Sequence, residues 1–387
     1  MQRGLLRASR IIIHPPTLQA ARPSSVFYLN TPRPVVPAAF WQQRGKHGRR
    51  IRRRGLFTER SIQNIDKRTV TTMWSSTIKL PISGLPETPH VRVSLPADFT
   101  KEQLDSFSPF RKWLDTLTHS LSLQHKNPQH PFHADPYALQ SIEIQSVDMW
   151  GARVGFLKLK ADIRNGAGEH LGGSVFLRGP AVAMLVMLIP DDAPTTTTAG
   201  EEAEEERYVV LTKQPRVPAG SLDFTELPAG MVDDADDDGE EEETASSSKV
   251  FAGAAAREIK EELDMEIPAS ELVSLTDLAA EKTSKGQDDD GDNQETVPFA
   301  MFPSAGGCDE YIPILMHERR VPRKTLEEWQ GRLTGLRRDG EKITLKIVPM
   351  RDLWREGLRD AKALAAVALW EGLKREGKLP KSKLGRL

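Results

Sequence analysis

The longest uninterrupted run of apolar residues in the chain occupies positions 181–189. It is nine residues long, whereas a helix that crosses a bilayer needs roughly 20 apolar residues. A short apolar run of this kind is typical of a buried β-strand. We therefore expect a folded core around this strand and no transmembrane helix.

Hydrophobic periodicity predicts further elements on both sides of this run. Helices are expected at 100–121, with a kink or a restart at Pro109, and at 250–263 and 359–376. Strands are expected at 141–147, 153–163, 174–177, 208–212, 224–227, 272–275, 299–302, 312–316 and 344–348. Strands and helices do not alternate regularly, and no GxGxxG motif follows a strand. The predicted fold class is therefore α/β in the α+β sense: an α/β/α sandwich preceded by a small antiparallel N-terminal sheet.

Charged residues are strongly segregated along the chain. Residues 1–58 contain twelve basic and no acidic residues, whereas 191–206, 233–243 and 288–295 contain 7, 9 and 5 acidic residues and no basic ones. The acidic stretches lack large apolar side chains, so we expect them to be flexible loops. The rest of the chain has 41 basic and 34 acidic residues, which fits an anionic small molecule and is too weak an excess to indicate nucleic acid.

The basic leader at 1–58 resembles a mitochondrial transit peptide, because its arginines are interspersed with Leu, Ile and Ser. A disordered basic tail is one alternative. Another is that the arginines at 49–54 form a nuclear-localisation or RNA-contacting patch. We expect a location in the mitochondrial matrix, with the cytoplasm or nucleus as alternatives. Cys308 is the single cysteine of the chain, which excludes an intramolecular disulfide and a zinc site of several cysteines.

Three glutamates are placed together by the predicted helix at 250–263. Glu258, Glu261 and Glu262 are three and four residues apart, so they share one helix face within about a turn. Carboxylates and substrate phosphates are the ligands of Mg²⁺ or Mn²⁺ in phosphate chemistry. The spacing thus favours a metal platform, but it also leaves open the commoner alternative of a charged face turned to solvent.

This segment also resembles a known sequence box, GX5EX7REUXEEXGU, in which U is a bulky aliphatic residue. It is the signature of the Nudix hydrolases, and the chain matches its second half at Arg257, Glu258, Ile259, Glu261, Glu262 and Met265. There are two departures. Asp264 stands where the box has Gly, and Gly230 lies 27 residues before Arg257, where the box has 14. An acidic and serine-rich insert accounts for the longer spacing, and it leaves no counterpart for the first glutamate of the box.

The resemblance extends beyond the box. Over residues 108–377 the chain is similar to the plant-type ADP-sugar diphosphatases of the Nudix family. The segments that carry it are 147–151, 156–163, 178–183, 216–218, 226–231, 306–310 and 360–362. It implies a leader at 1–58, a dimerising N-terminal α+β region at 73–178, a Nudix hydrolase domain at 179–377 and a tail at 378–387. Acidic inserts at 191–206, 233–249 and 284–296 interrupt the hydrolase domain.

The resemblance implies a function: hydrolysis of ADP-ribose or ADP-glucose to AMP and a sugar phosphate, with Mg²⁺ or Mn²⁺ as cofactor. By the same resemblance, Glu258 and Glu262 are the main metal ligands, Glu261 is a further ligand or positions water, and the Ala229 carbonyl is a backbone ligand. Arg257 is expected to pair with a neighbouring glutamate such as Glu261.

A base is expected on the loop at 304–310, which resembles a mobile loop of related ADP-ribose hydrolases. Glu310 is the candidate base or water-positioning residue, and Asp309 is its substitute. The alternative for Glu310 is an ordinary surface carboxylate at the start of a strand. Cys308 is expected to fit the loop and not to act as a nucleophile, because the chemistry requires no covalent intermediate.

The substrate is expected to meet two arginines, a glutamate and a tryptophan. Arg178 and Arg216 are candidate phosphate clamps, and each is alternatively a structural ion pair. Glu226 is a candidate partner of a ribose or adenine group. Trp150 is a candidate for stacking on adenine, in a homodimer that exchanges its N-terminal sheets, or else it is a core residue.

Two alternative functions stay open at this point. One is a catalytically degenerate Nudix scaffold that binds mitochondrial RNA or a ribosome; the number of glutamates at matching positions argues against it. The other keeps the chemistry and changes the substrate to UDP-glucose, a dinucleoside polyphosphate or NADH. We expect no membrane partner.

Overall fold

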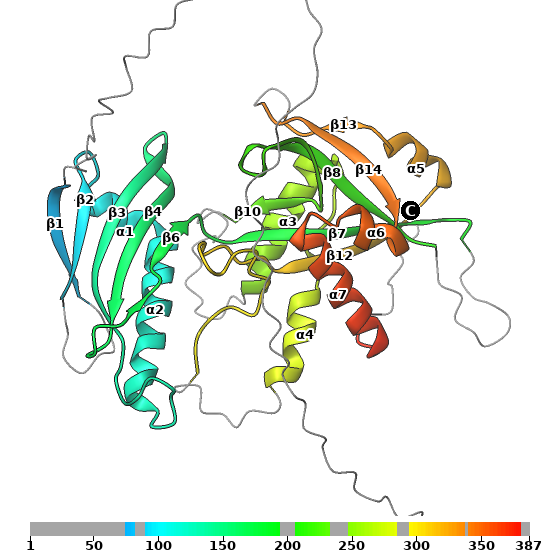
Figure 1. Cartoon of the computed structure of the whole chain (residues 1–387). Helices are drawn as coiled ribbons and strands as arrows, with labels where there is room; N and C mark the ends of the chain where they lie inside the picture. The colour runs from blue at the N-terminus through cyan, green and yellow to red at the C-terminus, as the bar shows by residue number, and fades with distance from the viewer. Residues whose placement is uncertain are drawn as a thin grey trace, which may run out of the picture. The chain divides into compact units, whose positions relative to one another are not determined.

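The structure is a computed structural model of the chain, and it describes residues 74–81, 90–193, 206–232, 247–284, 294–336 and 340–380. All of these belong to one compact unit, Arg68–Leu387. They form two β-sheets with associated helices (Figure 1). In this part of the chain, no helix combines the length and apolarity that a membrane crossing requires. The predictions for the leader and for most of each acidic stretch lie outside the described residues.

The first sheet has six strands in the order β1-β2-β3-β4-β5, and β6 pairs with β4. Its strands are β1 Trp74–Pro81, β2 His90–Pro96, β3 Ala138–Trp150, β4 Arg153–Arg164, β5 His170–Leu171 and β6 Ser174–Leu177. The predicted strands at 141–147, 153–163 and 174–177 are confirmed. The sheet is antiparallel except between β2 and β3, which pair in parallel. β1 and β2 were not predicted from the sequence.

Two helices cover the apolar face of the first sheet: α1 Lys101–Ser106 and α2 Ser108–Lys126. Thr100 caps α1 by accepting a hydrogen bond from the Gln103 N–H, and the Gln103 side chain accepts one from the Thr100 N–H. The chain breaks at Phe107, and Pro109 lies in the first turn of α2, where the lack of an N–H is harmless. The predicted restart at Pro109 is therefore confirmed.

The second sheet has eight strands in the order β11-β12-β7-β8-β14-β13, with β10 on β7 and β9 on β8. Its strands are β7 Ala181–Pro190, β8 Tyr208–Arg216, β9 Ser221–Glu226, β10 Ala229–Met231, β11 Val273–Ser274, β12 Ile314–Val321, β13 Leu333–Thr334 and β14 Ile343–Pro349. β7 and β12 pair in parallel, and the other strand pairs of this sheet are antiparallel.

Helices pack on both faces of the second sheet, which makes it an α/β/α sandwich as predicted. All ten residues of β7 are buried. Its odd-numbered residues from 181 to 187 share a core with α4 Leu275–Ser284, α6 Leu353–Glu356 and α7 Ala361–Arg375. Its even-numbered residues from 182 to 188 share a second core with α3 Ser247–Leu263 and α5 Arg323–Trp329. A strand covered on both faces has no polar side, which explains its unbroken apolar sequence.

Some predicted elements differ from the structure. At 299–302 there is no strand, because only Met301 forms an isolated bridge, with Ile312. At 272–275 the strand is limited to β11, and Leu275 already begins α4, which packs against α7. Helices α4 and α5 were not predicted, and neither were the short 3-10 helices at Val217–Ala219, Ala269–Glu271 and Met350–Asp352. The predicted helices at 250–263 and 359–376 correspond to α3 and α7.

Candidate active site

The last two turns of α3 carry the three glutamates that the sequence singled out. Ile259 and Leu263 of the same turns are fully buried in the sandwich core. They fix the helix against the sheet, so the glutamates are held near strand β10, with which α3 is in contact. Glu262 is 2% exposed, whereas Glu261 is half-buried.

Glu262 is held by two donors from neighbouring strands. The Ala229 N–H donates to its Oε2 at 3.2 Å, and Gln214 Nε2 donates to its Oε1 at 3.3 Å. Burial raises the pKa of Glu262 well above its ordinary value, and the charges of Glu258, Glu226 and Glu341 raise it further. The structure therefore places a carboxyl group in a buried and electronegative position, beside the residue whose carbonyl is the predicted backbone ligand.

The carboxyl group of Glu258 lies directly over Gly230. A Cβ atom at position 230 would stand 1.9 Å from the Glu258 carboxyl carbon. Burial raises the pKa of Glu258 to about 7, against the opposing effect of Arg257. The Arg257 guanidinium lies 3.6 Å from Glu258 Oε1, so Arg257 pairs with this neighbouring glutamate.

The donor set around α3 fits a divalent cation as part of a larger coordination shell. In the described ranges, no three His, Cys, Asp or Glu side chains converge closely enough to hold a metal ion by themselves. Mg²⁺ usually takes only one or two carboxylates and completes its shell with water and substrate phosphates. The repulsion by which Glu258 raises the pKa of Glu262 is the kind that a bound cation relieves. The lack of a side chain at Gly230 lets the Glu258 carboxyl group lie against the β10 backbone.

The loop that carries Glu310 is attached to strand β6. The Phe176 N–H donates to the Gly307 carbonyl at 2.8 Å, and the Asp309 N–H donates back to the Phe176 carbonyl at 3.3 Å. The Asp309 carboxylate accepts from the Arg178 N–H at 2.8 Å and from the Gly179 N–H at 3.1 Å. Asp309, the predicted substitute for Glu310, is therefore engaged with the backbone that follows β6.

Glu310 faces Arg178 across a short ion pair. Arg178 Nη1 lies 3.3 Å from Glu310 Oε1, and the Glu310 side chain is 14% exposed. Burial raises the pKa of Glu310, whereas the charges of Arg178, Lys362 and Arg216 lower it. The structure thus brings the predicted base and one predicted phosphate clamp together, inside a field of three cations.

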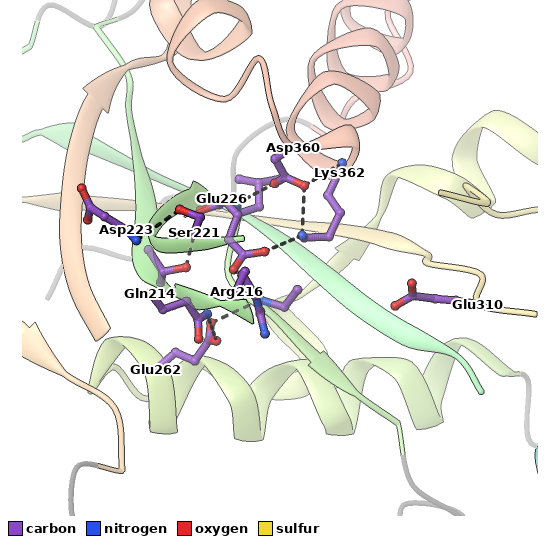
Figure 2. A network of polar contacts seen from close by, with 12 residues as sticks. Gln214, Arg216, Ser221, Asp223, Glu226, Glu262, Glu310, Asp360 and Lys362 are labelled. Carbon is purple, nitrogen blue, oxygen red and sulfur yellow. Dashed lines mark hydrogen bonds and ion pairs between the residues drawn. The ribbon is translucent and has the colours of Figure 1, made fainter. Parts of the chain in front are cut away.

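The second predicted clamp, Arg216, belongs to a network with Glu226 (Figure 2). Arg216 Nε donates to Glu226 Oε1 at 2.6 Å, and Lys362 Nζ donates to Glu226 Oε2 at 2.9 Å. Both oxygens of Glu226, the candidate ribose or adenine partner, are therefore bound to cations. In Figure 2, Glu310 stands apart from this network on its own segment.

Trp150 lies on the surface and not in the core. It is 40% exposed, and its ring packs edge-on against Phe156 at 4.9 Å and beneath the guanidinium of Arg153 at 5.7 Å. Trp150 and Arg178 line one cavity of about 330 Å³, together with Tyr311 and other residues. The glutamates of α3 and Glu310 do not line this cavity. The structure therefore groups the predicted site residues into a glutamate cluster and an aromatic cavity.

Three residues near the glutamates were not assigned a role from the sequence: Gln214, Glu341 and Lys362. Gln214 alternates with Thr212 and Arg216 along β8, and this period of two is a signal that was available. Glu341 is brought to α3 only by the tertiary fold. Lys362 lies two residues after Asp360, which caps the predicted helix at 359–376. Its ammonium group binds Glu226, which is distant in sequence.

Comparison with known proteins identifies the family. No family model matches the chain. A curated relative, Nudix hydrolase 14, chloroplastic, from Arabidopsis thaliana, is 35% identical over 289 residues, which are 74% of this chain and 77% of the relative. The chain belongs to the Nudix hydrolase family. A solved structure described as an ADP compounds hydrolase matches with a TM-score of 0.34 and 17% identity, over 62% of this chain and 99% of that chain.

At the end of α3, Asp264 stands in the position of the Gly in the closing part of the box. Asp264 has a φ of 54°, and among the described residues it is the one non-glycine residue with a positive φ. Helices commonly end on such a left-handed residue, usually a glycine. Asp264 also forms an ion pair with Arg332. Asp264 therefore takes the left-handed position at the end of a helix that is usually occupied by glycine.

Proposed function

We propose that the chain hydrolyses the pyrophosphate bond of ADP-sugars, ADP-ribose and ADP-glucose first, to AMP and a sugar phosphate. The observation that carries this proposal is that the buried carboxyl group of Glu262 and the half-buried one of Glu258 both lie against the Ala229–Gly230 backbone. A pyrophosphate is an anion that repels an oxygen nucleophile. A site for its hydrolysis therefore needs cations and an activated water.

In this proposal Glu258 and Glu262 hold Mg²⁺ or Mn²⁺ with the Ala229 carbonyl, and Glu261 is a further ligand or orients water. The metal supplies positive charge and a water of lowered pKa. Glu310 accepts the proton of the attacking water. Burial raises its pKa despite the three cations around it, which makes the carboxylate a stronger base. Arg178 and Arg216 bind phosphate oxygens.

The adenine is proposed to occupy the cavity of about 330 Å³ and to stack on Trp150. An exposed indole with a cation over one face suits a flat aromatic ligand. We further propose that the active form is a homodimer, as the resemblance of the N-terminal region implies. The name of the curated relative gives it as chloroplastic, which supports an organellar destination for this chain. The composition of residues 1–58 favours the mitochondrial matrix.

A hydrolysis screen of the full chain tests the proposal. ADP-ribose, ADP-glucose, UDP-glucose and NADH are incubated with the protein and Mg²⁺ or Mn²⁺, and the products are identified by mass. We expect AMP with ribose 5-phosphate or glucose 1-phosphate, and no turnover in excess EDTA. A folded protein that releases no AMP from either ADP-sugar would contradict the proposal.

The Glu262→Gln variant tests the ligand assignment in the same assay. It removes one charge and keeps the shape, so we expect the ADP-sugar turnover to fall by roughly 100-fold or more while the melting temperature is maintained. Glu266→Gln is the matched control, because Glu266 lies just after the same helix and its side chain is 81% exposed. Full turnover by Glu262→Gln would remove Glu262 from the metal site.

A further inference from the structure

Four side chains of alternating charge form a row of ion pairs from Arg216 to the start of helix α7 (Figure 2). Arg216 binds Glu226, Glu226 binds Lys362, and Lys362 Nζ also lies 2.9 Å from Asp360 Oδ1. The side chains of the inner three residues are at most 12% exposed, whereas that of Arg216 is 41% exposed. The outermost guanidinium is thus the member of the row that meets solvent.

At the inner end of this row of ion pairs, both carboxylate oxygens of Asp360 accept hydrogen bonds from the backbone. Asp360 caps α7 by accepting the Lys362 N–H at 3.1 Å, and its other oxygen accepts the Leu227 N–H at 2.9 Å. Leu227 directly follows Glu226. The turn at Asp360 and Lys362 therefore holds both the side chain of Glu226 and the peptide next to it. Charge-assisted hydrogen bonds of this kind are the stronger ones, and here they fix the frame on which Arg216 rests.

We propose that Lys362 is a positioning residue, which keeps the Arg216 guanidinium turned toward a phosphate group of the substrate. This rests on the proposed function, because it takes Arg216 as a phosphate ligand. Glu226 is neutralised from both sides, by Arg216 on one oxygen and by Lys362 on the other. Lys362 thereby leaves Arg216 bound to Glu226 through Nε alone, with its outer edge directed to solvent.

The loss of Lys362 removes one of the two cations that are bound to the Glu226 carboxylate. The buried carboxylate is left with Arg216 as its cation, and an unpaired buried carboxylate oxygen is costly. A guanidinium can satisfy both oxygens of a carboxylate at once through its planar fork. Arg216 then turns inward onto Glu226, and its Nη groups are withdrawn from the anion. A purely structural Lys362 would lower stability instead, with no effect that passes through Arg216.

A double-mutant cycle on the full chain distinguishes these two roles. ADP-ribose and inorganic pyrophosphate are the probes, and their dissociation constants are measured by calorimetry in EDTA, where hydrolysis is stopped. We expect Lys362→Met and Arg216→Gln each to weaken both probes about tenfold, the strength of one charged hydrogen bond. The double variant should bind no more weakly than Arg216→Gln alone, because Lys362 acts through Arg216.

Three results would overturn the proposal: unchanged binding by Lys362→Met, losses that multiply in the double variant, or no binding of either probe by the wild type. Lys346→Met is the matched control. It removes a lysine from an ion pair with Glu356 outside this network, and it should bind both probes normally. If Lys362→Met does not fold, Lys362→Gln serves in its place, because it removes the charge and keeps a polar side chain at the same position.

The two proposals fail separately. If ADP-ribose binds with the expected coupling and releases no AMP when Mg²⁺ or Mn²⁺ is present, the positioning role holds and the proposed function is wrong. If AMP is released and the two binding losses multiply, the proposed function holds and the positioning role is wrong.

Discussion

Gly230 is needed for space and not for an unusual backbone angle, since its φ is not among the positive values. The Glu258 carboxyl group occupies the volume that any side chain at position 230 would take. Two atoms cannot approach to 1.9 Å without a bond, so a larger residue must displace either the strand β10 or the glutamate. The free rotation of a side chain makes the glutamate the part that moves.

We therefore expect Gly230→Ala to reduce ADP-sugar hydrolysis by about 100-fold, because a displacement of about 1 Å at a reacting centre has effects of that size. Steady-state kinetics and a melting curve on the same sample check this. Gly253→Ala is the control, since position 253 on α3 is open and exposed, and alanine there should add about 0.5–1 kcal/mol of stability. Normal turnover by Gly230→Ala would show that Glu258 need not lie over that glycine.

At single residues, the sequence predicts positions along a helix but not contacts between distant segments. The spacing of Glu258 and Glu262 placed them on one helix face, because i and i+4 positions are neighbours on any helix. Nothing in that spacing predicts that Gln214 and the Ala229 N–H bind Glu262, since these contacts depend on how α3 docks on the sheet. Lys362 is distant in sequence from Glu226 for the same reason.

At the scale of elements, the end of α3 shows how a sequence departure is absorbed. Asp264 adopts the left-handed conformation that a glycine would adopt without strain, and its ion pair with Arg332 is on the exposed surface. An exposed pair of this kind contributes about 0–1 kcal/mol. The left-handed conformation costs a residue with a Cβ about 1–2 kcal/mol.

Asp264→Gly should accordingly raise the free energy of unfolding by about 0–1 kcal/mol, after the entropy that glycine adds to the unfolded chain and the lost ion pair with Arg332 are subtracted. Urea denaturation followed by circular dichroism measures it. Arg332→Gln, which removes only the ion pair, should lower stability by less than about 1 kcal/mol. A destabilised Asp264→Gly would mean that the Arg332 pair outweighs the backbone strain.

Long elements with a clear period were predictable, and short ones were not. β7 and α3 were predicted to within a few residues, because an unbroken apolar run and a repeated helical face are strong signals. β1 and β2 were missed although β2 alternates buried and exposed residues. Helix α4 was missed because its burial depends on α7, which lies far along the chain.

At the scale of the whole molecule, one buried histidine ties stability to pH. His317 on β12 is 5% exposed, and burial lowers its pKa, as does the charge of Arg319. The carbonyl and the carboxylate of Glu271 raise the pKa but do not reverse the shift. His317 therefore stays neutral in the folded protein at pH values where the unfolded chain already binds a proton.

The direction in which His317 changes the stability with pH follows from the difference between its pKa values in the folded and unfolded states. Above the unfolded pKa of about 6.5 both states are neutral and His317 has no effect. As the pH falls below that value, the unfolded state gains a proton first, and stability is lost until the folded pKa is passed. Between pH 7.5 and 5.5 we expect the melting temperature of the wild type to fall more, or rise less, than that of His317→Gln. The raised pKa values of Glu258 and Glu262 act in the opposite direction, and they do so equally in both proteins. His125 supplies the control, because its side chain is exposed: His125→Gln should leave the difference between wild type and His317→Gln unchanged. Equal slopes in wild type and His317→Gln would contradict this.

The attachment of the Glu310 loop to β6 limits where the protein can be cut into independent fragments. The backbone partners of Gly307 and Asp309 belong to residues 176–179, at the junction of the two sheets. A polypeptide cut at that junction would lose the anchor of the loop along with the first sheet. The first sheet is therefore not an accessory module that recombination could exchange freely. Any graft of this hydrolase domain has to carry strand β6 and the Arg178–Gly179 turn with it.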